Sequence, residues 1–139
     1  MLASLFTSRA IYYREKNNFK HRDVLISVVI QEMVDPKHAG VMFTVDPIMK
    51  KDILIEVVEG LGEKLVSGEV TPNTFFIDKK TYEINNKNIE FDFDESKLKP
   101  IAKIGEKIEE HFGSPQDIEF VLDEKNKLYV VQSRPITTL

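Results

Sequence analysis

Short runs of apolar residues alternate along this chain with polar connections that contain glycine and proline. Three of the runs are dominated by β-branched residues: 23–34 (DVLISVVIQEMV), 41–45 (VMFTV) and 53–58 (ILIEVV). Val and Ile favour extended backbone, and each run is too short for a long buried helix, so the pattern predicts three strands. The PKHAG stretch between the first two runs predicts a turn.

Two other segments repeat apolar residues at the three- and four-residue spacing of an amphipathic helix. The first segment opens the chain, and its apolar stripe consists of Leu2, Leu5, Phe6 and Tyr13. The second segment runs from about Ser96 to Phe112 and stops at Gly113, since glycine is common just beyond a helix end. Pro100 has to occupy the first turn of this helix or kink it.

Two hairpins complete the pattern. FFID and TYEIN, on either side of a DKK tip, predict the first, and residues 117–135 (DIEFVLDEKNKLYVVQSRP) predict the second. Clustered glycines and a proline predict a shaped loop between residues 60 and 73, with room for one brief strand. Connections of hairpin length join antiparallel strands, so we expect a single α+β domain over residues 1–139. It should contain a mostly antiparallel sheet with helices packed on one face.

The composition restricts the class of protein. A chain of 139 residues with 42% apolar and 30% charged residues is typical of one soluble globular domain. A net charge of −4 disfavours nucleic acid or an anionic membrane as the main partner. The absence of cysteine excludes disulfides and cysteine-based metal sites. No apolar run approaches the length of a bilayer span, so we expect a soluble, cytoplasmic protein.

The second hairpin carries polar side chains at positions where a purely structural strand would be apolar. Because side chains alternate along a strand, Asp117 and Glu119 share one face, and Gln132 and Arg134 share one face of the next strand. The same alternation places two apolar residues beneath this patch, Val121 and Val130. A two- or four-residue loop would pair Glu119 with Gln132 and Asp117 with Arg134, whereas an odd loop would shift the register.

Two interpretations of this patch are open. Mg²⁺ prefers oxygen ligands, so Glu119 and Gln132 could hold a magnesium-bound polyphosphate whose phosphates Arg134 grips with its planar guanidinium. Alternatively, Asp117 and Arg134 form a cross-strand ion pair beside two solvated residues. Spacing alone favours the ion pair.

The remaining polar candidates are weaker. His21, His38 and His111 are far apart in the sequence and flanked by polar or turn residues, which is typical of surface histidines and not of a metal site. Gln31 is either a strand-end residue that caps a backbone group or a residue that hydrogen-bonds a ligand such as a nucleobase. Glu56 either needs a buried partner or points to water.

Several motifs, in order, resemble one family: VVIQEMV, AGVMFTVDP, IEVVEGLGEKLVSGEVTP, PQDIEF and VVQSRPIT. They are similar to the nucleotide-binding domain of the phosphoenolpyruvate synthase and pyruvate phosphate dikinase family, which includes rifampicin phosphotransferases. The opening ASLFTSRAIYYR resembles a helix of the same domain. The resemblance spans nearly the whole chain, although DIEF replaces the commoner DIEW.

The resemblance implies an ATP-grasp fold, in which two α+β lobes close on ATP and Mg²⁺, and this chain resembles the second lobe. By the resemblance, Glu119 and Gln132 bind the metal ion and the phosphates. Arg134 contacts the phosphates and acts as the catalytic residue that stabilises charge. The adenine slot would be lined by Gln31 and by the backbone of Glu32, Met33 and Val34. This implication favours the metal site over the simple ion pair.

The family's first lobe, its phosphohistidine domain and its pyruvate-binding barrel have no counterpart here, so we expect a fragment without turnover of its own. It would be the ATP- and Mg²⁺-binding portion of a phosphotransferase like phosphoenolpyruvate synthase, which converts ATP and pyruvate to phosphoenolpyruvate through a phosphohistidine. The alternatives are a fragment of rifampicin phosphotransferase type and a non-catalytic subunit. Such a subunit would dock on a partner polypeptide that carries the missing lobe and phosphohistidine domain.

Overall fold

The computed structural model describes residues 2–62, 65, 68 and 70–137 of the chain. These residues group into two compact units, Met1–Met33 and Val34–Leu139. The expectation that the chain is one domain, and a fragment of a larger nucleotide-binding domain, stays a prediction. In the described ranges no helix is both long enough and apolar enough to cross a membrane.

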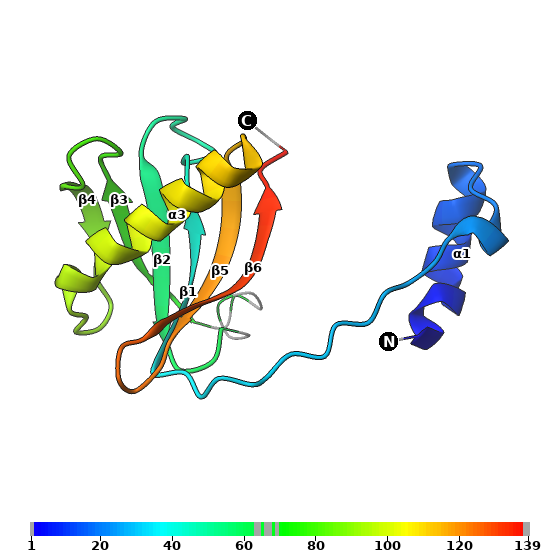
Figure 1. Ribbon diagram of the computed structural model, residues 1–139, viewed down its shortest axis with the longest axis horizontal. Helices are drawn as coiled ribbons and strands as arrows, with labels where there is room; N and C mark the ends of the chain where they lie inside the picture. Colours follow the sequence, from blue (N-terminus) through cyan, green and yellow to red (C-terminus); the bar gives the residue numbers. More distant parts are fainter. Residues whose placement is uncertain (1, 63–64, 66–67, 69, 138–139) are drawn as a thin grey trace. The chain divides into compact units, whose positions relative to one another are not determined.

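The larger unit is built on a six-stranded sheet with the strand order β4-β3-β2-β1-β5-β6, and every neighbouring pair is antiparallel (Figure 1). The helix α3 crosses one face of this sheet. The expected α+β class with an antiparallel sheet is confirmed. In chain order, the elements are β1 His38–Phe43, β2 Ile53–Glu59, β3 Asn73–Ile77, β4 Ile84–Asn88, α3 Leu98–Phe112, β5 Gln116–Leu122 and β6 Leu128–Pro135.

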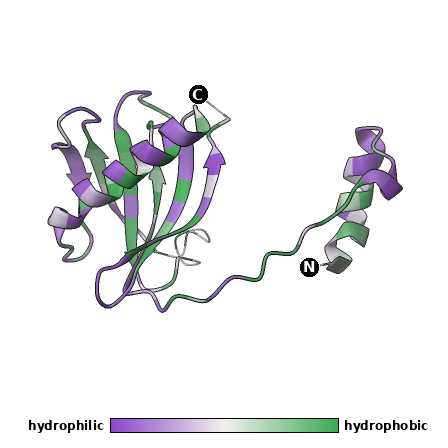
Figure 2. Ribbon diagram, viewed as in Figure 1, coloured by the Kyte–Doolittle hydropathy of each residue, from purple (hydrophilic) through white to green (hydrophobic). Residues whose placement is uncertain are grey.

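The core of this unit lies between the sheet and α3. Alternate residues of β2 point to the helix, and three of them are fully buried: Ile53, Ile55 and Val57. Figure 2 shows the corresponding banding of apolar and polar residues along the strands and around α3. From α3, Leu98, Ile101 and Ala102 pack into the same cluster. Every second residue of the strand therefore packs against the apolar residues that recur every three or four positions along the helix, as the sequence predicts.

Helix α3 begins and ends as predicted. A 3-10 turn, η3 (Glu95–Lys97), precedes the helix, and Asp94 accepts a hydrogen bond from the backbone N–H of Ser96. Pro100 is the third residue of the helix, where its missing N–H has no helical partner to lose. Gly113 ends the helix with a φ of +68°, a left-handed conformation that glycine adopts without strain.

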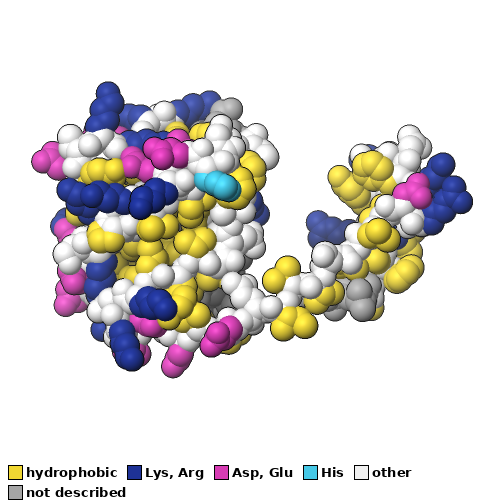
Figure 3. Space-filling view, viewed as in Figure 1, with side chains coloured by type: hydrophobic (Ala, Val, Ile, Leu, Met, Phe, Trp, Pro, Cys, Tyr) yellow, Lys and Arg dark blue, Asp and Glu magenta, His cyan; other side chains and the backbone are white. Residues whose placement is uncertain are grey.

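The strand predicted at residues 23–34 is absent. The structure places a 3-10 turn, η2 (His21–Asp23), at its start, and residues 24–36 have no regular secondary structure. This run is not among the six strands of the described sheet, and strand propensity without a hydrogen-bonded neighbour does not make a strand. The run is consequently exposed, and its apolar side chains are visible in Figure 3. The most exposed are Leu25 (88%), Val29 (76%), Ile30 (96%) and Met33 (85%).

Three smaller predictions also need correction. The PKHAG turn is too long, because β1 already begins at His38 and pairs there with both β2 and β5. The TYE of the first hairpin belongs to its turn, since Asp78 accepts hydrogen bonds from the backbone N–H groups of Lys80 and Thr81. The expected loop at 60–73 lies partly outside the described residues.

The smaller unit contains a 3-10 helix, η1 (Leu2–Phe6), and the helix α1 (Ser8–Lys16), so the predicted opening helix is divided at Thr7. The Thr7 hydroxyl accepts a hydrogen bond from the backbone N–H of Ala10 and begins α1. The expected apolar stripe is not buried, because Phe6 is 75% exposed and Tyr13 61% exposed. The buried side chain of α1 is Arg14, which donates to the carbonyl of Leu5 and to His21 Nδ1.

Candidate functional site

The sheet face opposite α3 is apolar but uncovered by any helix among the described residues of the larger unit (Figure 1). Val41, Phe43, Leu54 and Phe76 point to this face and are half-buried. The side chains on a solvent-exposed face of an antiparallel sheet are normally polar. The apolar character of this open face therefore indicates a surface that binds a ligand or another layer of protein.

The strand pairings bring polar residues from separate strands into one row across the open face. Val41 of β1 lies directly opposite Glu56 of β2 on one side and Glu119 of β5 on the other. Glu56 in turn lies opposite Thr74 of β3, and Glu119 lies opposite Gln132 of β6. Residues directly opposite in an antiparallel pair share a face. All five side chains consequently belong to one row.

The predicted pairing of Glu119 with Gln132 and of Asp117 with Arg134 is confirmed. The reason differs from the one expected, because the connection between β5 and β6 runs from 123 to 127 and has an odd length. Near this turn Phe120 pairs with Val130, but the register shifts before Glu119 pairs with Gln132. One extra residue in β6, Val131, thus forms a β-bulge that restores the predicted register.

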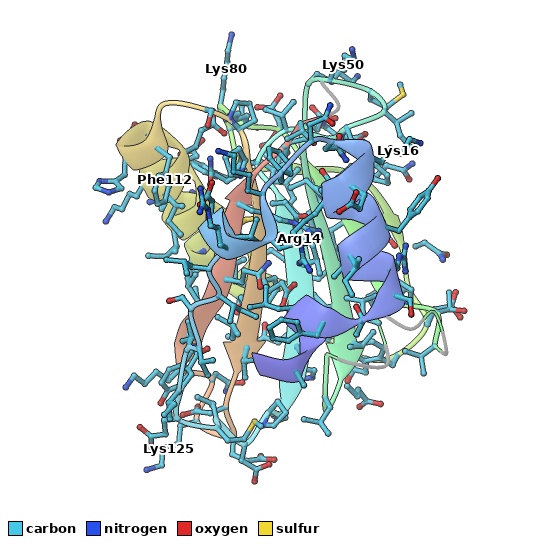
Figure 4. The ribbon with its side chains drawn as sticks, turned by 90° about the vertical axis from the view of Figure 1, so that its right-hand side faces the viewer. Arg14, Lys16, Lys50, Lys80, Phe112 and Lys125 are labelled. Atoms are coloured by element: carbon cyan, nitrogen blue, oxygen red, sulfur yellow. The ribbon has the colours of Figure 1, made fainter. Side chains whose placement is uncertain are left out.

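The bulge also corrects one detail of the expected patch. Val130 pairs with Phe120, a core residue that faces α3, so Val130 does not lie beneath Glu119 and Gln132 on the open face. Val121 pairs with Tyr129 and keeps its place on the open face. The tip of this hairpin, marked by Lys125 in Figure 4, is at the opposite end of the sheet from Lys50 in the β1–β2 connection.

Asp117 holds Arg134 in place. Both Nε and Nη2 of Arg134 lie 2.7 Å from the same oxygen, Oδ2 of Asp117. The Asp117 side chain is only 11% exposed, whereas the Arg134 side chain is 65% exposed. The hydrogen bond and the charge of Asp117 raise the pKa of the Arg134 guanidinium. Arg134 therefore stays a fixed cation whose remaining N–H donors face outward, where an anion could reach them.

The strand ends that carry these residues are tied together on the α3 side of the sheet. Ser133 lies between Gln132 and Arg134 in the sequence, and its hydroxyl donates a hydrogen bond to Gln116 Oε1 at 2.9 Å. The backbone N–H of Gln116 donates to the hydroxyl of Thr44, also at 2.9 Å. Gln116 and Thr44 are fully buried. These supports fix the backbone from which Gln132 and Arg134 project, and the sequence pattern gave no sign of them.

The oxygen atoms at this position fit a magnesium ion. Glu119 offers a carboxylate and Gln132 an amide oxygen, from facing positions on neighbouring strands. Across the described residues, no three His, Cys, Asp or Glu side chains gather into a metal cluster. Mg²⁺ usually takes one or two protein carboxylates and completes its shell with phosphate and water, so this donor set suits it.

A cavity of about 540 Å³ adjoins the Asp117–Arg134 pair. Its walls combine the ion pair with residues that follow β1 and β6: Phe43, Pro47, Asp117, Arg134, Pro135, Ile136 and Thr137. The cavity opens beside the guanidinium and is largely uncharged otherwise. It is a place where a group bound by Arg134 could extend.

The residues expected around adenine belong to no strand of the described sheet. Gln31, Glu32 and Met33 belong to the smaller unit and are exposed, and Val34 begins the larger unit. Their role in an adenine slot stays a prediction. Glu56 is the residue whose position the sequence left open, and the structure places it on the open face, where burial raises the pKa of its carboxyl.

The chain matches a family described as the AMP/ATP-binding domain of pyruvate phosphate dikinase, over residues 1–93 and 87–139. It is 45% identical to a probable phosphoenolpyruvate synthase of Methanothermobacter thermautotrophicus, over 99% of this chain and 24% of that protein. It is 42% identical to a probable phosphoenolpyruvate synthase of Methanocaldococcus jannaschii, over 99% of this chain and 14% of that protein. The rifampicin phosphotransferase of Bacillus subtilis is also 42% identical, over 99% of this chain and 19% of that protein.

The chain therefore belongs to the pyruvate phosphate dikinase AMP/ATP-binding domain family, as its motifs suggested. It spans about a quarter or less of the length of these relatives. The alignments extend over 163 or 165 positions, which exceeds the 139 residues of the chain, so the relatives carry additional residues inside the matched stretch. The two family matches overlap at residues 87–93, which include the last two residues of β4.

Proposed function

We propose that this chain supplies the metal- and phosphate-binding half of an ATP site, in the manner of the second lobe of an ATP-grasp fold. The observation that carries the proposal is the arrangement of the last hairpin on the open face. Glu119 lies opposite Gln132 there, and Asp117 holds Arg134 beside them. The membership of an AMP/ATP-binding domain family supports a nucleotide as the ligand.

Each residue has a role that its position supports. Glu119 and Gln132 would hold a magnesium ion, which when bound neutralises charge on the polyphosphate. Arg134 would bind the phosphate oxygens and stabilise the charge that develops on them during transfer, so it is the candidate catalytic residue. Asp117 keeps the guanidinium oriented, and the open face would exclude water when a second layer covers it.

The reaction that we propose for the complete protein is phosphoryl transfer from ATP to pyruvate through a phosphohistidine, as in a phosphoenolpyruvate synthase-like phosphotransferase. The names of the relatives support this class, and a rifampicin phosphotransferase-type acceptor is the alternative within it. The histidine that carries the phosphoryl group would lie outside this chain, because none of its three histidines has the family's motif.

A second candidate function is a non-catalytic subunit that docks on a polypeptide with the missing lobe and phosphohistidine domain. The exposed apolar run between residues 24 and 33 favours it, because a strand-forming segment with free backbone groups is suited to pairing with a partner's sheet. Glu119 has no part in such docking, so a measurement on Glu119 separates the two functions.

The test is calorimetric titration of the chain with ATP in the presence and absence of Mg²⁺. We expect saturable binding that requires Mg²⁺, and Glu119→Gln should weaken it about tenfold or more, since the variant loses a charged metal ligand. The matched control is Glu124→Gln, which removes the same charge from the exposed turn of the same hairpin and should change the affinity less than about twofold. Binding that is indifferent to Glu119→Gln would refute the assigned site, and absence of binding would refute a self-sufficient half-site.

A further inference from the structure

Glu56 lies on the open face two strands away from Glu119. Val41 of β1 stands between them, directly opposite both residues. Neighbouring strands are about 4.8 Å apart, so the two acidic positions are about 10 Å apart, with the aliphatic surface of Val41 between. A ligand held at Glu119 and Gln132 that extends across the sheet toward β2 would pass over Val41 and reach Glu56.

The Glu56 carboxylate has no partner within the described chain. Among the described residues no hydrogen bond or ion pair involves its side chain, and the residues directly opposite are Val41 and Thr74. The side chain is half-buried, and burial raises the pKa of its carboxyl. A partly desolvated carboxylate without a donor is costly, so such a group is expected where a ligand supplies the donor.

The chemistry of the row limits which part of a nucleotide can meet Glu56. A carboxylate repels phosphate, so it suits a neutral group with hydrogen-bond donors. Vicinal sugar hydroxyls are neutral donors that follow the phosphates along a nucleotide, and the furanose ring that carries them could rest on Val41.

We propose that Glu56 accepts hydrogen bonds from the ribose hydroxyls of the nucleotide whose phosphates lie at Glu119, Gln132 and Arg134. The inference rests on the proposed function and adds to it a direction: the nucleotide lies across the strands, with its phosphates over β5 and β6 and its sugar over β1 and β2. Glu56 then selects a ribonucleotide over an analogue without the hydroxyls.

The experiment titrates the full chain and its Glu56→Gln variant with three magnesium-bound probes: ATP, 2′,3′-dideoxy-ATP and tripolyphosphate. Glu56→Gln should weaken ATP binding about tenfold, because a hydrogen bond to a neutral amide oxygen is weaker than one to a charged carboxylate. It should change the binding of the other two probes less than about twofold. The matched control, Glu59→Gln, removes the same charge from an exposed position of β2 and should leave all three affinities unchanged.

The outcomes separate this inference from the proposed function. If Glu56→Gln weakens the binding of ATP and of dideoxy-ATP equally, or weakens neither, the proposed sugar contact is overturned. The proposed function still stands in that case if binding depends on Glu119. A wild-type chain that binds none of the probes overturns both. Loss of stability would not explain weaker binding, because Glu56→Gln removes an unpaired charge from a half-buried position. Urea denaturation should accordingly show that the variant is at least as stable as the wild type.

Discussion

His38 is buried at the start of β1 (5% exposed), against the expectation of a surface histidine. Its ring stacks on Phe91 with centroids 6.0 Å apart and meets the ring of Phe93 edge-on at 5.1 Å. Its Nδ1 has no hydrogen-bond partner among the described residues. Burial, helped by the charges of Lys97 and Lys37, lowers the pKa of His38 below its ordinary value of 6.5. The fold therefore disfavours the protonated form of His38.

This makes a prediction for stability against pH. At pH values below about 6.5 the His38 side chain is protonated to a greater extent in the unfolded chain than in the folded chain, so its contribution to the free energy of unfolding falls as the pH falls. The loss can reach about 1.4 kcal/mol per pH unit for one proton. His38→Leu should lack this component, and urea denaturation of both proteins at about pH 7.5 and about pH 5.5 checks it.

His111 provides the control, because it is exposed near the end of α3. His111→Gln should keep the same pH dependence as the wild type. An unchanged pH dependence in His38→Leu would show that His38 is not held neutral by its surroundings. The other charged groups that act on His38 are Glu59 and Glu124, whose attraction opposes but does not overcome the lowering of the pKa.

At the scale of the element, the end of α3 depends on one glycine. Gly113 has a φ of +68°, and a Cβ added there would meet no atom within 4 Å. A substitution at this position is therefore strained through its backbone conformation alone and not through crowding.

Gly113→Ala should lower the free energy of unfolding by about 1 kcal/mol, because alanine resists the left-handed conformation. Gly113→Asn should cost less than half as much, since asparagine tolerates that conformation. Urea denaturation at constant pH measures both. Equal stability of Gly113→Ala and the wild type would mean that the helix can end in another way.

The hairpin of β5 and β6 shows what an element adds to its residues. Alternation predicts which side chains share a face, but the register depends on the length of the turn and on the bulge at Val131. Two deviations, an odd turn and one extra residue, compensate each other. The facing of Glu119 and Gln132 could be predicted, while the backbone route that produces it could not.

At the scale of the whole molecule, every member of the buried apolar cluster comes from residues 42–122. None comes from the smaller unit, Met1–Met33. The larger unit therefore contains its own core, which α3 and the six strands of the sheet enclose among the described residues.

Residues 34–139 should consequently fold without residues 1–33. We expect a cooperative urea transition with a free energy of unfolding within about 1 kcal/mol of that of the full chain, because distant and independent parts contribute additively. Circular dichroism of the two proteins measures it. Loss of the cooperative transition would show that the larger unit needs the smaller one.

The sequence by itself determined the features that depend on neighbours along the chain. These are the apolar periodicity and glycine stop of α3, the alternation in β2, the facing pairs of the last hairpin and the motifs of the family. The tertiary structure alone decided the features that depend on pairing between distant segments. Residues 23–34 have strand propensity but pair with no strand among the described residues, and Glu56 and Glu119 enter one row only because β1 pairs with both β2 and β5. Propensity is a local property, whereas a sheet forms from strands that the chain brings together over long distances.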